Sequence, residues 1–82
     1  MYFTFHLNSN SRNNEIHIYE DDNRRPLCND NVIKGKTAGI FVNKQIANDK
    51  FCENDARIFA ALLQNLGHNV CGVCMSAMYL TR

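Results

Sequence analysis

The sequence predicts an α+β fold in a single domain that spans residues 1–82. Two segments near the N-terminus alternate apolar and polar residues, and one long segment in the second half repeats apolar residues at helical spacing. Four cysteines are distributed among and after these segments. We therefore expect a small antiparallel sheet, made of an N-terminal hairpin and a third strand, packed by one main helix and followed by a C-terminal cysteine turn and a short helix.

The sheet is expected to begin with a β-hairpin. Residues 2–7 and 15–20 both show the alternation of a half-buried strand, and the polar run 8–14, NSNSRNN, predicts the turn between them. The third strand is predicted at residues 39–43, GIFVN, where apolar and β-branched residues follow a glycine. The segment 28–39 is mostly polar and is expected to form a loop.

The main helix is predicted between about residues 49 and 66 and should end at Gly67, a favourable helix stop. Its apolar stripe consists of Ile58, Phe59, Leu62, Leu63 and Leu66. A second, short helix is expected from Cys74 to Leu80. The predicted core residues are Phe3, Phe5, Ile16, Ile18, Phe59, Leu62 and Leu66.

Composition narrows the classes of function. The net charge is +1 with acids and bases interspersed, whereas nucleic-acid-binding domains usually carry a clear basic excess. The N-terminus lacks the pattern of a signal peptide, and no stretch approaches the roughly 18 apolar residues of a membrane span. We therefore expect a cytoplasmic protein, away from the membrane. Thiols stay reduced in the cytoplasm, which favours metal ligation by the cysteines over two disulfides.

The pair Cys71 and Cys74, with Gly72 between them, is the clearest chemical motif. A two-residue spacing predicts a tight knuckle that turns both sulfurs and nearby backbone N–H groups toward one cation. A domain this short buries a modest core, so a structural metal would supply stability that the core lacks. We predict a zinc site with four ligands, formed by Cys71 and Cys74 together with Cys28 and Cys52.

Two alternatives to this ligand set stay open. His17 is the other candidate for the fourth position, and Cys52 is preferred because four thiolates suit a soft-leaning cation. Cys28 and Cys52 are alternatively ordinary buried cysteines, since free cysteine is among the most buried residue types.

Catalytic motifs are missing from the sequence. It contains no nucleophile elbow, no phosphate-cradling glycine loop and no HExxH, so we do not expect an enzyme. The CGVC turn itself is similar to the thioredoxin active site, where a helix N-terminus lowers the pKa of the first cysteine. That family carries its motif early and a cis-proline later, whereas here the only proline, Pro26, precedes Cys74. The turn is similar but its context differs, so thiol–disulfide redox chemistry at Cys71 and Cys74 is kept as an alternative function that ranks below the two described next.

Two segments, IHIYEDDNRRPLC (16–28) and VCGVCMSAMY (70–79), together resemble small zinc-ribbon or zinc-finger-like proteins that are common in bacteriophage genomes. The ligands that this resemblance implies are His17, Cys28, Cys71 and Cys74. Cys52 has no counterpart in that pattern. The resemblance also implies a phage or mobile-element protein that binds and inhibits a host protein.

These observations predict a non-enzymatic, zinc-stabilised protein-interaction module whose partner is a host protein. Its expected contact residues, of types enriched at binding hot spots, are Tyr2, Tyr19, Arg24 and Arg25. The first alternative is a nucleic-acid-binding zinc ribbon, which would combine basic residues with stacking aromatic rings. The residues available for that role are Arg24, Arg25, Lys34, Lys36 and Lys44, with Tyr19 or Phe41.

Overall fold

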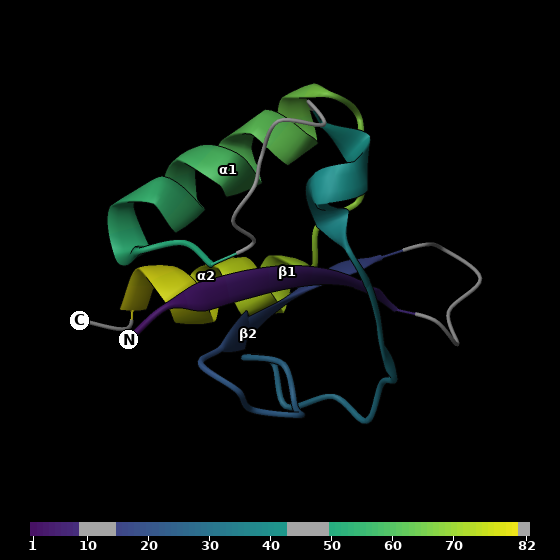
Figure 1. Cartoon of the computed structure of the whole chain (residues 1–82), viewed down its shortest axis with the longest axis vertical. Coiled ribbons are helices and arrows are strands. Elements are labelled where there is room, and N and C mark those ends of the chain that lie inside the picture. The colour runs from purple at the N-terminus through teal and green to yellow at the C-terminus, as the bar shows by residue number, and fades with distance from the viewer. Residues whose placement is uncertain (9–14, 43–49, 81–82) are drawn as a thin grey trace.

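The computed structural model describes residues 1–8, 15–42 and 50–80 of the chain (Figure 1). Its elements in order are β1 (Phe3–Asn8), β2 (Ile16–Glu20), β3 (Lys34–Thr37), a 3-10 helix η1 (Ala38–Phe41), α1 (Glu53–Asn65) and α2 (Gly72–Leu80). The strands form one antiparallel sheet in the order β2-β1-β3. In Figure 1, α1 lies above this sheet and the segment that joins β2 to β3 lies below it. The predicted α+β class is confirmed.

The hairpin of β1 and β2 forms where the alternation predicts it, and most of the predicted turn lies outside the described residues. Phe5 pairs with Ile18, and His6 pairs with His17. The four predicted core residues of the hairpin are each at most 1 % exposed. Tyr19 and His17, on the opposite face of β2, are buried as well, so both faces of this strand are covered. Tyr19 was predicted to be a surface contact residue, and its burial shows that this prediction is wrong.

The third strand lies earlier in the chain than predicted. β3 is formed by the sequence KGKT and pairs with the C-terminal half of β1, whereas Ala38–Phe41 forms η1. The predicted strand at residues 39–43 is therefore wrong for its described part. Lys34 and Lys36 are exposed, so β3 lacks the apolar alternation that marks a half-buried strand. Its backbone pairs with β1, and the His6 Nδ1 lies 3.0 Å from the Gly35 carbonyl oxygen.

Helix α1 begins at Glu53 and not at about residue 49, because the residues before it extend the sheet. Phe51 and Phe3 exchange two backbone hydrogen bonds, of 2.7 and 2.9 Å, which require extended backbone at Phe51. The Phe51 ring then stacks on Phe59 of α1, with centroids 4.5 Å apart, and meets Phe5 of β1 edge-on. These three rings join α1 to the sheet.

The buried face of α1 is turned relative to the predicted stripe. Its buried residues are Ala56, Phe59, Ala60 and Leu63. Leu62 and Leu66, two predicted core residues, are 41 % and 52 % exposed, so that part of the core prediction is wrong. The ring of Phe59 contacts the rings of Phe5 and Phe51, and these contacts turn this side of the helix toward the sheet. Neither α1 nor α2, the α-helices of the described residues, is long and apolar enough to cross a membrane.

Replacement of a buried and an exposed leucine on α1 tests this orientation. Leu63→Ala should lower the free energy of unfolding by about 2–5 kcal/mol, because it empties a fully buried position. Leu62→Ala is the matched control, and its partly exposed side chain should cost less than about 1 kcal/mol. Urea denaturation of both variants in the same buffer measures the difference. A larger loss for Leu62→Ala than for Leu63→Ala would contradict this orientation and place Leu62 in the core, as the sequence predicted.

Candidate metal centre

The outer edge of β2 is occupied by the segment that leads into α2. The Ile16 N–H donates to the Asn69 carbonyl at 2.8 Å, and the Cys71 N–H donates to the Ile16 carbonyl at 2.8 Å. Ile16 and Val70 thus form a parallel bridge on the side of β2 that faces away from β1. This pairing places Cys71 next to Ile16, the residue that precedes His17 in β2. The Met75 N–H donates to the Cys71 carbonyl, which starts α2 and places Cys74 in its first turn.

The chain reaches this edge because of how α1 ends. Gly67 has a φ of 89°, and its N–H donates to the Gln64 carbonyl, while the His68 N–H donates to the Leu63 carbonyl. These two bonds are the Schellman motif, in which a residue with positive φ stops the helix and reverses the chain. Gly67 is the expected stop, and it directs the following residues to β2.

A second segment meets the same edge of β2 from the other direction. The Leu27 N–H donates to the Ile18 carbonyl at 2.8 Å, and a turn follows in which the Asn29 N–H donates to the Pro26 carbonyl at 2.9 Å. Asn29 has a φ of 61°, a conformation that asparagine tolerates better than most residues. Cys28 lies inside this turn. Backbone hydrogen bonds to the two neighbours of His17 therefore place Cys28 and Cys71 beside that histidine.

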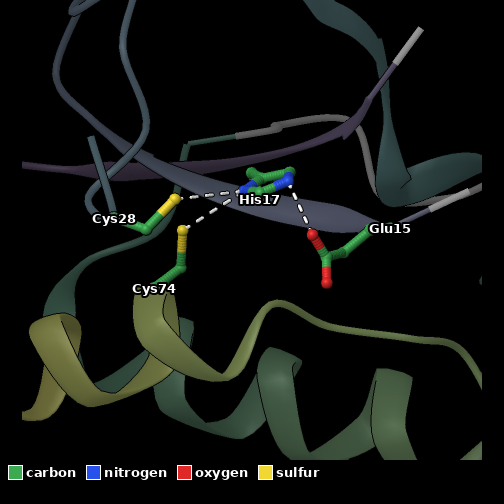
Figure 2. A network of polar contacts seen from close by, with 4 residues as sticks. All are labelled: Glu15, His17, Cys28 and Cys74. Atoms are coloured by element: carbon green, nitrogen blue, oxygen red, sulfur yellow. Dashed lines mark hydrogen bonds and ion pairs between the residues drawn. The ribbon is translucent and has the colours of Figure 1, made fainter. Parts of the chain in front are cut away.

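Four side chains converge where these segments meet: His17, Cys28, Cys71 and Cys74. Their nitrogen and sulfur ligand atoms all lie within 4.8 Å of one another. The His17 Nδ1 is 3.4 Å from the Cys28 sulfur and 3.6 Å from the Cys74 sulfur, and Figure 2 shows both sulfurs pointing at this nitrogen. Cys74 is fully buried, His17 and Cys71 are buried, and Cys28 is half-buried.

The distances within this group fit a tetrahedral metal ion. A zinc ion with bonds of about 2.3 Å to sulfur and about 2.0–2.1 Å to nitrogen separates sulfur from nitrogen by about 3.6 Å and sulfur from sulfur by about 3.8 Å. The two sulfur–nitrogen distances of 3.4 and 3.6 Å match the first value. One nitrogen lone pair cannot accept well-aligned hydrogen bonds from two thiols, whereas a shared cation satisfies all of these atoms at once.

Burial makes the thiol groups weak acids in the absence of a cation. Desolvation is the largest cause that raises the pKa of Cys74, and it also raises the pKa of Cys28. Tyr19, which stands two residues after His17, has its pKa raised to about 12 by desolvation and then by the nearby charges of Cys74 and Cys28. Thiolates gathered in such surroundings need a positive charge between them, and a coordinated metal ion would provide it.

The predicted site residues divide into two groups. Cys28, Cys71 and Cys74 come together as expected, and the structure adds His17 in place of Cys52. Cys52 is exposed and immediately precedes α1, where the Ala56 N–H donates to its carbonyl. Cys52 follows Phe51, whose backbone pairs with Phe3 of β1, and this position at the start of α1 keeps it out of the cluster of His17 and the other three cysteines. The strand alternation already set His17 on the face opposite Ile16 and Ile18, and it was the predicted alternative for the fourth ligand.

The predicted details of the C-terminal turn also change. α2 begins at Gly72, so the two residues between the cysteines belong to its first turn and the short helix starts earlier than predicted.

Comparisons of the chain with protein-family models, with curated proteins and with solved structures find no match. The resemblance to phage zinc-ribbon-like proteins therefore stays a prediction.

Thiol labelling of the native protein tests the placement of the four cysteines. Cys52 should react first with a maleimide because it is exposed, and Cys74 last because it is buried and its raised pKa suppresses the reactive thiolate. Mass spectrometry of digests after timed labelling gives the order. Cys52→Ser should remove the fastest reaction and leave the others unchanged. Faster labelling of Cys74 than of Cys52 would contradict the described burial.

Proposed function

We propose that this protein is a non-enzymatic, zinc-stabilised module that binds another protein. The observation that carries the proposal is the convergence of three thiols and one imidazole, from three separate chain segments, at distances that suit one tetrahedral ion. Three cysteines and one histidine form a ligand set typical of structural zinc. All four positions of such an ion come from the protein, so no position is left for a substrate or an activated water.

The proposed metal would join the partly exposed segment between β2 and β3 to β2 and α2, which belong to the core. The segment between β2 and β3 carries Cys28, and the residues that precede Cys28 from Asp22 to Arg25 are exposed. Few apolar contacts therefore offset the conformational entropy that this segment loses on folding. A metal bound by Cys28, His17 and the start of α2 would close the long loop that runs from Cys28 to α2. The free energy of metal binding would then contribute directly to folding.

The outer face of α1 supports the interaction part of the proposal. Ile58, Leu62 and Leu66 are 61 %, 41 % and 52 % exposed and follow one another at four-residue spacing along the helix. The stretch from Ile58 to Leu66, IFAALLQNL, contains no charged residue. A partner protein with an apolar groove would bury this stripe in the manner of an amphipathic helix, since charged residues are depleted from interface cores. We infer a host protein as the partner of a phage or mobile-element protein in the cytoplasm.

The two alternative functions have less support. Nucleic-acid binding needs exposed rings beside the basic residues, and Tyr19 is buried, with the Lys34 ammonium 4.8 Å above its ring centroid. Redox chemistry at Cys71 and Cys74 needs an accessible thiol, whereas both cysteines are buried, and burial raises the pKa of Cys74. The proposed module is favoured over both.

Metal content and stability together test the zinc site. Protein purified without chelator should contain one equivalent of zinc by elemental analysis. Cys74→Ser should lose the zinc and unfold or melt at a much lower temperature, because structural zinc contributes on the order of 10 kcal/mol in small domains. Cys52→Ser is the matched control and should keep both zinc and melting temperature, since Cys52 lies outside the group.

Solution conditions separate the possible roles of the thiols. A strong chelator should mimic Cys74→Ser, and a reductant without chelator should have little effect on the melting temperature. Sensitivity to reductant with indifference to chelator would identify a disulfide instead. Indifference to both would leave the cysteines as ordinary core residues and would remove the zinc proposal.

Polar substitutions on α1 test the interaction surface. Ile58→Gln and Leu62→Gln should abolish co-purification of a host protein that wild type captures directly, while the melting temperature changes little because both side chains are largely exposed. Ile33→Gln, at a 59 % exposed position before β3, removes a comparable apolar side chain elsewhere and should leave binding intact. Equal binding by all variants would place the contact surface elsewhere, and self-association through α1 in sedimentation would identify a second copy as the occupant.

A further inference from the structure

The second ring nitrogen of His17 has a specific neighbour. While Nδ1 faces the sulfurs of Cys28 and Cys74, Nε2 points to the opposite side and lies 2.9 Å from Oε1 of Glu15 (Figure 2). Nε2 is buried and has no well-aligned hydrogen bond, so this carboxylate is the acceptor within its reach. The imidazole is therefore held between an anion on one side and the thiol group on the other.

The strand geometry explains the contact. Side chains two residues apart in extended backbone project from the same face, and Glu15 stands two residues before His17. The Asn8 N–H donates to the Glu15 carbonyl at 3.0 Å, which ties the backbone of Glu15 to the end of β1. The Glu15 side chain is 33 % exposed, whereas that of His17 is 1 % exposed. Glu15 thus lies between solvent and the buried ring.

We propose that Glu15 is a positioning residue of the metal centre, which holds the proton of neutral His17 on Nε2 and so presents the Nδ1 lone pair to the metal. The inference rests on the proposed zinc site. A neutral imidazole carries its proton on one nitrogen and a lone pair on the other, so an acceptor at Nε2 decides which atom is free to bind. The same contact fixes the ring orientation and makes the ligand nitrogen a better electron donor.

Zinc affinity and ring spectroscopy test this role together. In zinc-loaded wild type, long-range ¹H–¹⁵N NMR of His17 should show a protonated Nε2 and a metal-bound Nδ1, with the Nε2 proton protected from exchange with water. Glu15→Ala should lose that protection and weaken zinc binding by about 10- to 100-fold in competition with a chromophoric chelator. Glu15→Gln keeps a carbonyl oxygen that accepts from Nε2–H, so its affinity should lie between those of Glu15→Ala and wild type.

Glu20→Ala is the matched control, because Glu20 ends the same strand and has the same charge but pairs with Phe3, away from the metal centre. It should bind zinc like wild type. Zinc bound through Nε2, or equal affinity of wild type and both Glu15 variants, would overturn the role of Glu15 while leaving the zinc site intact. A wild type that binds no zinc would instead overturn the zinc site and this inference with it. If Glu15→Ala fails to fold, the Glu15→Gln affinity and the wild-type ring spectrum decide.

Discussion

Backbone hydrogen bonding along the outer edge of β2 is the interaction on which the rest of the structure depends. β2 pairs with β1 on one side, and on the other side Ile16 and Ile18 bond to the backbone of two distant segments. An edge strand with open N–H and C=O groups is prone to pair with other chains, and here the protein's own backbone occupies part of that edge. The same bonds deliver Cys28 and Cys71 to the flanks of His17. The position of these cysteines beside His17 is therefore a consequence of the backbone hydrogen bonds that cover this edge of β2.

The edge pairing also explains why β2 is buried on both faces. Ile16 and Ile18 join the apolar core with Phe3 and Phe5, whereas His17 and Tyr19 point to the other face, which the segment that carries Cys28 covers. An imidazole in such a place needs partners for both nitrogens, since a buried polar atom without one is costly. Two cysteine sulfurs face Nδ1, and the Glu15 carboxylate oxygen lies 2.9 Å from Nε2 without a well-aligned hydrogen bond. Burial of the His17 imidazole would be unfavourable without these neighbours, and with them the ring becomes the point at which three chain segments meet.

The sequence predicted the parts of this fold that are written in local periodicity. The alternation in β1 and β2, the stop at Gly67 and a short C-terminal helix all depend on neighbouring residues, and each is present in the structure, although this helix begins at Gly72 and includes Cys74. β3 escaped prediction because KGKT is held by pairing with β1 and not by burial of its own side chains. The stripe of α1 was misjudged because the pattern gave Leu62 and Leu66 more weight than Ala56 and Ala60, which are the buried residues. Cys52 was preferred over His17 because residue type was considered without knowledge that Phe51 binds Phe3 and so holds Cys52 away.

A division of labour follows from these contacts. The candidate metal centre is enclosed by β2, the turn at Cys28 and the start of α2, and its residues are mostly buried. The apolar side chains exposed on α1, those of Ile58, Leu62 and Leu66, flank the face of that helix on which Ala56 and Leu63 pack against the core. Because no residue of α1 belongs to the metal centre, loss of a metal would affect α1 only by destabilising the whole fold. Substitutions of its exposed apolar residues would leave the ligands in place. In the proposed function, a closed metal centre would stabilise the chain and a separate helix would provide recognition, so that 82 residues would supply both a stable structure and an apolar binding surface.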